Sequence, residues 1–328
     1  MIKHDMLAID INVFRTAVKD INFDVFLQLS ESNFVHVFSK ITGLDYKRLA
    51  QYRQKGVTHL HIKSEDLETY RDFLAKPAAA ILRDPNVSHE KRVATLLNMT
   101  EQNMAELFSQ LYVEEETAVN TSHLVKNYVE LMSTNPDTLV VLLKLVSHGE
   151  YLYYHSVAVS ILSIMMSKAS GQFDQNTLES IGLGGFLHDI GWTQLPREIF
   201  LSSEALTDLE WKEVKCHPGI GLKMLEQTVT VPKESKYIIY QHHEEPGGRG
   251  YPNGLRDKVI YHPAKFVSLA DGFSALISKR PFRPAYTVEQ ALRIITNTRG
   301  KYDPDLVRLS VTLFARGINK APHKRSAA

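Results

Sequence analysis

The sequence has 328 residues, of which 44% are hydrophobic and 23% charged, values typical of a globular protein of about two domains. The 38 Lys and Arg residues nearly balance the 37 Asp and Glu residues, giving a formal net charge of +1, which argues against a DNA-binding surface or a polybasic membrane anchor. The single cysteine, Cys216, excludes an internal disulfide framework and is typical of a reducing compartment. With no signal-peptide pattern and no apolar run long enough to span a membrane, we expect a soluble cytoplasmic protein.

Residues 1–77 have the pattern of a small mixed domain. Two apolar runs, 25–29 and 34–38, are separated by a polar turn, which predicts a β-hairpin. A helix, a strand and a second helix should follow over 45–55, 57–62 and 64–76. The result is a ββαβα unit, for which we expect a regulatory or docking role.

Residues 78–120 are interpreted as a linker that contains an amphipathic helix. A connection over 77–86 includes Asp84-Pro85, and apolar residues then recur at helical spacing over 88–112. The helix either packs onto a domain or acts as a signalling or dimerisation helix, so a homodimer is one expectation. The sequence leaves both alternatives open.

Residues 121–320 show helical periodicity and almost no strand pattern. The fold class expected is therefore α+β overall, with an all-α helical bundle joined to the small N-terminal domain. The predicted helices cover 122–132, 136–146, 153–169, 176–188, 207–225, 235–243, 259–278, 288–298 and 304–314. Bundles of this kind build metal sites from side chains of facing helices.

Seven candidate ligands lie at apolar positions or at the ends of these helices. Asp271, for example, interrupts an apolar run, where a carboxylate is costly unless it is paired or bound to a metal. Imidazole and carboxylate suit Fe, Mn, Zn or Co, and the lack of Cys ligands argues against a purely structural zinc site. Seven ligands suit two ions bridged by a carboxylate, which together activate a hydroxide and hold a phosphoryl group. The candidates are His155, His188, Asp189, His217, His242, His243 and Asp271.

Several ordered elements of this domain resemble the HD-GYP family of HD-superfamily phosphodiesterases, which hydrolyse the bacterial second messenger cyclic di-GMP. The resemblance covers about residues 121–314 and implies an HD-type helical bundle. The elements are His188-Asp189-Ile190-Gly191, His217-Pro218-Gly219-Ile220-Gly221, His242-His243-Glu244 and Gly250-Tyr251-Pro252.

The resemblance implies a role for each ligand. Asp189 would bridge two divalent transition-metal ions, iron in the first place and manganese as the alternative, and would act with His188 in catalysis. One ion would be held by His155, His188 and Asp271, and the other by His217, His242 and His243. Members with three metals carry a Glu where this chain has Tyr151, so we expect two ions.

The resemblance also implies a set of substrate contacts. Arg280 and Arg283 would bind phosphates or guanines, and Gly250 and Tyr251 would border the substrate groove. Trp192 stands where the family has a Lys, and it either stacks on a guanine or forms a hydrophobic cover. Asp residues usual in the family are replaced by Gly247 and Ser274.

These replacements predict slow hydrolysis of cyclic di-GMP to pGpG or GMP. A non-catalytic cyclic di-GMP receptor is the first alternative. It would signal to partner proteins, such as those of GGDEF type, through the N-terminal module or the Gly-Tyr-Pro loop. Hydrolysis of another phosphoester is the second alternative, because a fold does not fix a substrate.

Overall fold

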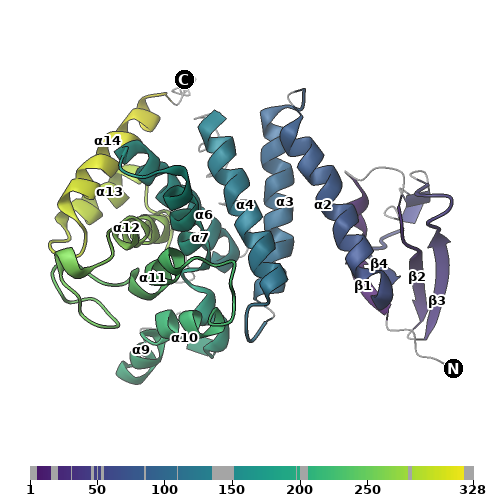
Figure 1. Cartoon of the computed structure of the whole chain (residues 1–328), viewed down its shortest axis with the longest axis horizontal. Helices are drawn as coiled ribbons and strands as arrows, with labels where there is room; N and C mark the ends of the chain where they lie inside the picture. The colour runs from purple at the N-terminus through teal and green to yellow at the C-terminus, as the bar shows by residue number, and fades with distance from the viewer. Residues whose placement is uncertain are drawn as a thin grey trace, which may run out of the picture. The chain divides into compact units, whose positions relative to one another are not determined.

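The computed structural model divides into two compact units, Met1–Thr95 and Leu96–Ala328, each described by itself below (Figure 1). Among the helices described, none has the length and apolar content that a membrane crossing requires. The residues that the structure describes are 6–15, 21–30, 32–45, 48–49, 51–52, 55–84, 86–108, 110–134, 151–196, 198–199, 206–279 and 283–320.

Four strands form one antiparallel sheet in the N-terminal unit, in the order β1-β4-β2-β3. The predicted hairpin is present as β2 and β3. The prediction lacks β1, whose residues form a strand because they pair along their whole length with β4, from Met6 opposite Lys63 to Asp10 opposite His59. The strands are β1 (Met6–Asp10), β2 (Val25–Ser30), β3 (Asn33–Phe38) and β4 (His59–Lys63).

Helix α2 (Leu67–Arg83) follows the sheet after a short 3-10 turn, η2 (Ser64–Asp66). It contributes Phe73 to the core of this unit, where the Phe73 ring lies edge-on to Phe23 with centroids 5.2 Å apart. The predicted connection over 77–86 is wrong for most of its length, because α2 continues through Pro77 to Arg83. Three alanines follow Pro77, and alanine is the strongest helix former.

The boundary between the two units falls inside α3 (His89–Leu107), the predicted amphipathic helix. In the second unit, α3 meets α4 (Glu115–Thr134) through buried polar contacts. The Thr121 hydroxyl donates to Asn103 Oδ1 at 2.9 Å, and the hydroxyls of Thr100 and Tyr128 lie 2.8 Å apart. Buried hydrogen bonds of this kind fix one register between two helices, because an unpaired polar group would be costly.

The second unit is a helical bundle, which confirms the α+β class and the all-helical second domain. The predicted helix over 136–146 lies outside the described residues. After α4, the main elements are α6 (Tyr151–Ser170), α7 (Gln175–Leu187), η4 (Ile190–Gln194), α9 (Asp208–Val214), α10 (His217–Met224), α11 (Lys233–Gln241), η5 (Asp257–Val259), α12 (His262–Ile277), α13 (Val288–Asn297) and α14 (Pro304–Lys320).

The predicted single helix over 207–225 is wrong, because a turn at Lys215 and Cys216 separates α9 from α10. Pro218 occupies the first turn of α10. A proline is tolerated there, since its missing N–H would have no partner within the helix, whereas inside a longer helix it would remove a bond. The break places His217 at the first position of α10.

Two glycines of α7 allow neighbouring helices to approach it closely. A Cβ at Gly185 would lie 3.1 Å from Ser160 Cα on α6, and one at Gly184 would lie 2.7 Å from Ile238 Cγ2 on α11. Side chains at these positions would push the helices apart. The small residues therefore bring the ligand-bearing ends of α6, α7 and α11 together.

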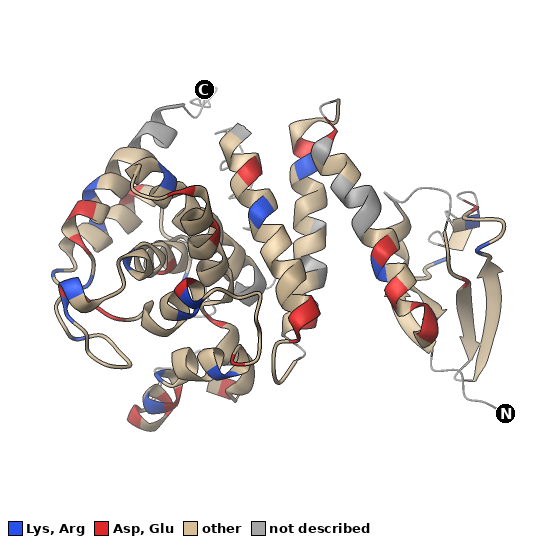
Figure 2. Ribbon diagram, viewed as in Figure 1, with Lys and Arg blue, Asp and Glu red and all other residues tan. Residues whose placement is uncertain are grey.

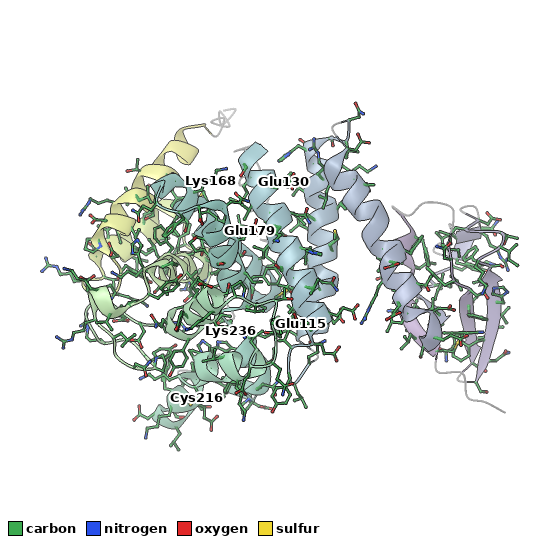
Figure 3. The ribbon with its side chains drawn as sticks, viewed as in Figure 1. Glu115, Glu130, Lys168, Glu179, Cys216 and Lys236 are labelled. Atoms are coloured by element: carbon green, nitrogen blue, oxygen red, sulfur yellow. The ribbon has the colours of Figure 1, made fainter. Side chains whose placement is uncertain are left out.

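The segment before α11 is held by two charged residues labelled in Figure 3, Glu115 and Lys236. The Glu115 carboxylate accepts hydrogen bonds from the backbone amides of Val229 and Thr230, at 2.7 and 2.8 Å. Lys236 Nζ donates to the carbonyl of Thr228 at 2.9 Å. These contacts fix the start of α11, and the other end of this helix carries His242.

Candidate metal centre

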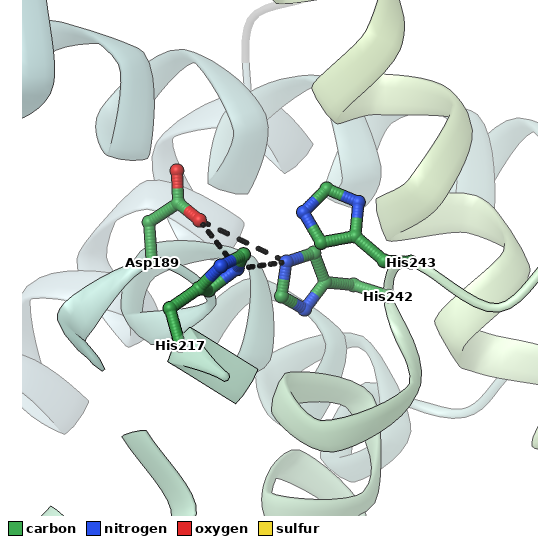
Figure 4. Close-up of side chains that lie close together, drawn as sticks. All are labelled: Asp189, His217, His242 and His243. Atoms are coloured by element: carbon green, nitrogen blue, oxygen red, sulfur yellow. Dashed lines mark hydrogen bonds and ion pairs between the residues drawn. The ribbon is translucent and has the colours of Figure 1, made fainter. Parts of the chain in front are cut away.

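The seven predicted ligands converge from five helices on one buried region of the bundle. They form two groups, and within each group the potential ligand atoms lie within 4.8 Å of one another. Figure 4 shows the first group around Asp189 and His217. The first group is Asp189, His217, His242 and His243, and the second is His155, His188 and Asp271.

Three of the histidines are oriented by the same backbone contact. The Nδ1 atoms of His188, His217 and His242 lie 2.7 to 2.8 Å from the carbonyl oxygens of Gly185, Val214 and Ile239, each three residues earlier in the chain. A carbonyl oxygen only accepts, so Nδ1 carries the proton and donates. The Nε2 atom of each ring is then directed into the cluster, which is the arrangement that a metal ligand requires.

His155 is oriented by a side chain rather than by the backbone. Its Nδ1 lies 3.1 Å from the hydroxyl of Ser274, which is fully buried, and its Nε2 lies 3.1 Å from Asp271 Oδ1. Ser274 and Asp271 both belong to α12, three residues apart, so one face of that helix holds both ring nitrogens. No role for Ser274 as an orienting group follows from the sequence, because His155 lies 119 residues away.

The two carboxylate oxygens of Asp189 face different groups of ligands. Oδ2 lies 3.1 Å from His188 Nε2, and Oδ1 lies 3.2 Å from His217 Nε2. His188 Nε2 and Asp189 Oδ1 are both buried without a hydrogen-bond partner among the described residues. Polar atoms buried in this way are costly, and a bound cation would satisfy both of them.

A second contact also favours a cation. The Nε2 atoms of His217 and His242 face each other at 3.2 Å, while the Nδ1 proton of each ring is directed to a backbone carbonyl. Two lone pairs at this distance repel each other unless a proton or a metal ion lies between them. The donor set of imidazole and carboxylate therefore fits a transition-metal ion.

Burial and charge set the protonation of the cluster without metal. Burial by itself lowers the pKa of His188, but the charge of Asp189 outweighs it and raises the pKa to about 9. Burial lowers the pKa of His243 to about 3, and it also holds the pKa of His242 well below its usual value. The last two rings are therefore neutral at physiological pH and are available as ligands.

Two aromatic side chains cover the first group. The Trp192 ring stacks on His217, with centroids 5.3 Å apart and planes 29° apart. The Tyr251 ring lies 4.6 Å from His243 and 6.3 Å from His217. Burial, followed by the negative charges of Asp189 and Asp271, raises the pKa of Tyr251, so its hydroxyl stays protonated and can donate.

The Gly-Tyr-Pro loop is held in place by Glu244, which is 1% exposed. Its two carboxylate oxygens accept hydrogen bonds from the backbone amides of Asn253 and Leu255, both at 2.7 Å. A Cβ at Gly250 would collide with the backbone of His243, Glu244 and Glu245, so a glycine is required there. The sequence assigns Glu244 no such role, because its partners are backbone amides on the far side of the loop.

Of the two arginines predicted to contact the substrate, the structure describes only Arg283. Arg280 lies outside the described residues. The guanidinium of Arg283 donates to the backbone carbonyls of Ala275, Leu276 and Pro284, at 2.8 to 3.1 Å. It also lies 4.3 Å from the centroid of the Tyr286 ring. These guanidinium donors already bind backbone carbonyls near the end of α12. The contact of Arg283 with substrate stays a prediction.

The helical bundle and its histidine–aspartate cluster define a metal-binding HD-type domain. A family model described as "HD domain" matches residues 141–306. The chain belongs to the HD domain family, and its resemblance to the HD-GYP proteins within it is confirmed.

Three similar proteins illustrate this relationship. A Pseudomonas aeruginosa protein named cyclic di-GMP phosphodiesterase is 33% identical over 59% of this chain and 47% of its own length. A Thermotoga maritima protein named cyclic di-GMP phosphodiesterase is 28% identical over 74% of this chain and 65% of its own length. The chain thus spans about half to two thirds of these curated relatives.

The third is a solved structure, described as an HDG"Y"P protein from Bdellovibrio bacteriovorus. It matches 95% of this chain and all of its own chain, with a TM-score of 0.68 and 20% sequence identity. At this level of identity the similarity establishes the fold.

Proposed function

We propose that this protein is a metal-dependent phosphodiesterase that hydrolyses cyclic di-GMP. The observation that carries the proposal is the position of Asp189, whose Oδ1 and Oδ2 face two separate groups of ligands. A carboxylate between two clusters is the arrangement expected of a bridging ligand. The names of the two curated relatives support cyclic di-GMP as the substrate.

In this proposal, seven residues hold two divalent ions, iron in the first place and manganese as the alternative. Asp189 would hold both ions. His155, His188 and Asp271 would complete one site, and His217, His242 and His243 would complete the other. Tyr151 in place of a Glu ligand favours two ions over three.

Bound divalent ions would supply a hydroxide nucleophile at neutral pH and would neutralise charge on the phosphoryl oxygens. The residues of the chain prepare this chemistry. The backbone carbonyls behind His188, His217 and His242 hold the ring orientations before substrate arrives. Trp192 and Tyr251 cover one side of the cluster, which limits access of bulk water.

The substrate would enter beside the Gly-Tyr-Pro loop, along Gly250 and Tyr251, with Arg280 and Arg283 as further contacts. Trp192 in place of a lysine, together with Gly247 and Ser274 in place of aspartates, predicts slow turnover. A reducing, cytoplasmic location agrees with the single Cys216. We also propose that a GGDEF-type partner docks on the Gly-Tyr-Pro loop and that the protein forms a homodimer.

The test is incubation of iron- or manganese-loaded protein, purified without oxygen, with cyclic di-GMP. We expect pGpG or GMP as product and about two ions per chain by elemental analysis. If the protein binds cyclic di-GMP but forms no product with either metal, the proposed enzymatic function is wrong and the non-catalytic receptor is favoured. If the protein hydrolyses only other phosphodiesters, the proposed substrate is wrong and the proposed reaction class, phosphodiester hydrolysis, stands.

A further inference from the structure

An open depression of about 550 Å³ lies against α9, outside the ligand groups described above. Charged side chains of both signs lie on this helix (Figure 2). Trp211 is 47% exposed, although a large aromatic ring is usually mostly buried. Trp211 and Lys212 follow Asp208 by three and four residues, which places them on one face of α9. Lys215 follows by seven residues and caps the helix on the same face. Among the residues that the structure describes, those lining the depression are Asp208, Trp211, Lys212 and Lys215.

Lys215 connects this depression to the candidate metal centre. Its Nζ lies 5.9 Å from the centroid of the Tyr251 ring, within the range of a cation–π contact. The Tyr251 ring in turn lies 4.6 Å from the His243 ring. The break between α9 and α10 explains this position, because Lys215 caps α9 only two residues before His217.

We propose that the depression is a second-nucleotide subsite, which binds the half of cyclic di-GMP whose phosphate is not being cleaved. A cyclic dinucleotide has two phosphates and two bases. When one phosphate lies at the metal centre, the other half of the ring must therefore lie beside it. The depression has a volume in the range of small-molecule sites. Its lining residue Lys215 lies over the Tyr251 ring, which lies beside His243 of the cluster.

Each lining residue supplies a contact that a guanine nucleotide needs. The exposed face of Trp211 can stack on a base. The ammonium groups of Lys212 and Lys215 can pair with the second phosphate. The Asp208 carboxylate only accepts hydrogen bonds, which suits the N–H donors of guanine and not the ring nitrogens of adenine.

The subsite rests on the proposed function, so the test uses the metal-loaded protein and two substrates. Lys215→Met removes the charge and keeps the length of the side chain, and Trp211→Ala removes the ring. We expect each to raise KM for cyclic di-GMP by about tenfold or more, with a smaller effect on kcat. The loss in kcat/KM should be smaller for bis(p-nitrophenyl) phosphate, which has no second phosphate.

Lys233→Met is the matched control. Lys233 Nζ lies 5.4 Å from the Tyr237 ring, so the same type of pair is removed on α11. This variant should keep the KM of the wild type. Asp208→Asn should reduce the preference for cyclic di-GMP over cyclic di-AMP.

The outcomes distinguish the subsite from the proposed function. If the wild type hydrolyses cyclic di-GMP, and Lys215→Met and Trp211→Ala have the same KM as Lys233→Met, the subsite is overturned while the function stands. If the wild type neither binds nor hydrolyses cyclic di-GMP, the proposed function fails and the subsite fails with it. If Lys215→Met lowers kcat/KM equally for both substrates, Lys215 affects the metal centre itself rather than a second nucleotide. That result would also overturn the subsite.

Discussion

The Trp192 ring stacks on the imidazole of His217, with ring centroids 5.3 Å apart and planes 29° apart. This contact supports the interpretation of Trp192 as a cover for the ligands. It also explains how a bulky side chain is accommodated where a lysine is usual among HD-GYP proteins. Trp192 therefore offers the most direct test of what limits the proposed reaction.

Trp192→Lys should raise kcat for cyclic di-GMP by about tenfold or more, because one cation at a reacting phosphate contributes strongly to transition-state stabilisation. The same change should lower the melting temperature, since a stacked aromatic pair contributes roughly 0.5–1.5 kcal/mol. Trp192→Phe keeps a ring and adds no cation, so it should give no rise in kcat. If the lysine variant is no faster than the phenylalanine variant, the missing cation does not limit turnover.

Asp189→Ala should abolish both metal content and hydrolysis, because its two oxygens face both groups of ligands. Elemental analysis and product formation are the measurements. Asp174→Ala is the control at the other end of α7, where Asp174 Oδ1 accepts a hydrogen bond from the Thr177 amide. That variant should lower the melting temperature but retain metal. Metal retained by Asp189→Ala would show that the assignment of the bridge is wrong.

Glu244→Ala should loosen the Gly-Tyr-Pro loop without removing a ligand. Two hydrogen bonds to a buried carboxylate are lost, and each such bond contributes about 1.5–3 kcal/mol. We expect faster hydrogen exchange at the amides of Asn253 and Leu255, a higher KM, and metal content close to that of the wild type. Unchanged exchange at both amides would contradict this role of Glu244.

Gly250→Ala should strongly destabilise the loop, because a Cβ there collides with the backbone of His243 and Glu245. Gly219→Ala is the matched control in the same bundle, since its Cβ would meet Tyr240 Cε2 at 4.0 Å, an ordinary van der Waals contact among the described residues. Thermal unfolding of both variants is the measurement. The first should unfold at a clearly lower temperature, and the second should be neutral or slightly stabilised. Equal melting temperatures would refute the close approach.

Metal binding should release protons in a pH-dependent way. In the metal-free protein the pKa of His188 is raised to about 9, so His188 is charged near neutral pH and must lose about one proton to bind a metal. The release should therefore disappear as the pH rises through about 9. Calorimetry in buffers of different ionisation enthalpy measures the number of protons. A release that is constant across this range would contradict the raised pKa of His188.

The same pKa determines how His188 contributes to the stability of the metal-free protein. Its pKa is raised from 6.5 to about 9 on folding. The charged pair with Asp189 therefore stabilises the fold fully below the unfolded value, and this contribution is lost as the pH rises through the folded value. Chemical unfolding of metal-free protein at a series of pH values should show this decline on the alkaline side.

Much of the bundle could be predicted from the sequence because helical periodicity is local. Most predicted helices after residue 150 agree with the structure to within a few residues. The errors had both long-range and local causes. Strand β1 forms only by pairing with β4, about 50 residues later. The break at Lys215 has a local cause, since α10 begins at His217 with Pro218 in its first turn.

The sequence by itself determined the kinds of ligand available, five imidazoles and two carboxylates on apolar helices, because side-chain chemistry is a property of each residue. Only the tertiary structure decided how they meet. His155 and Asp271 are 116 residues apart in the chain and 3.1 Å apart in space. The orienting roles of Ser274 and Glu244, and the position of Lys215 beside Tyr251, depend equally on helix packing. Such distances arise from the packing of the whole core and have no counterpart in local sequence patterns.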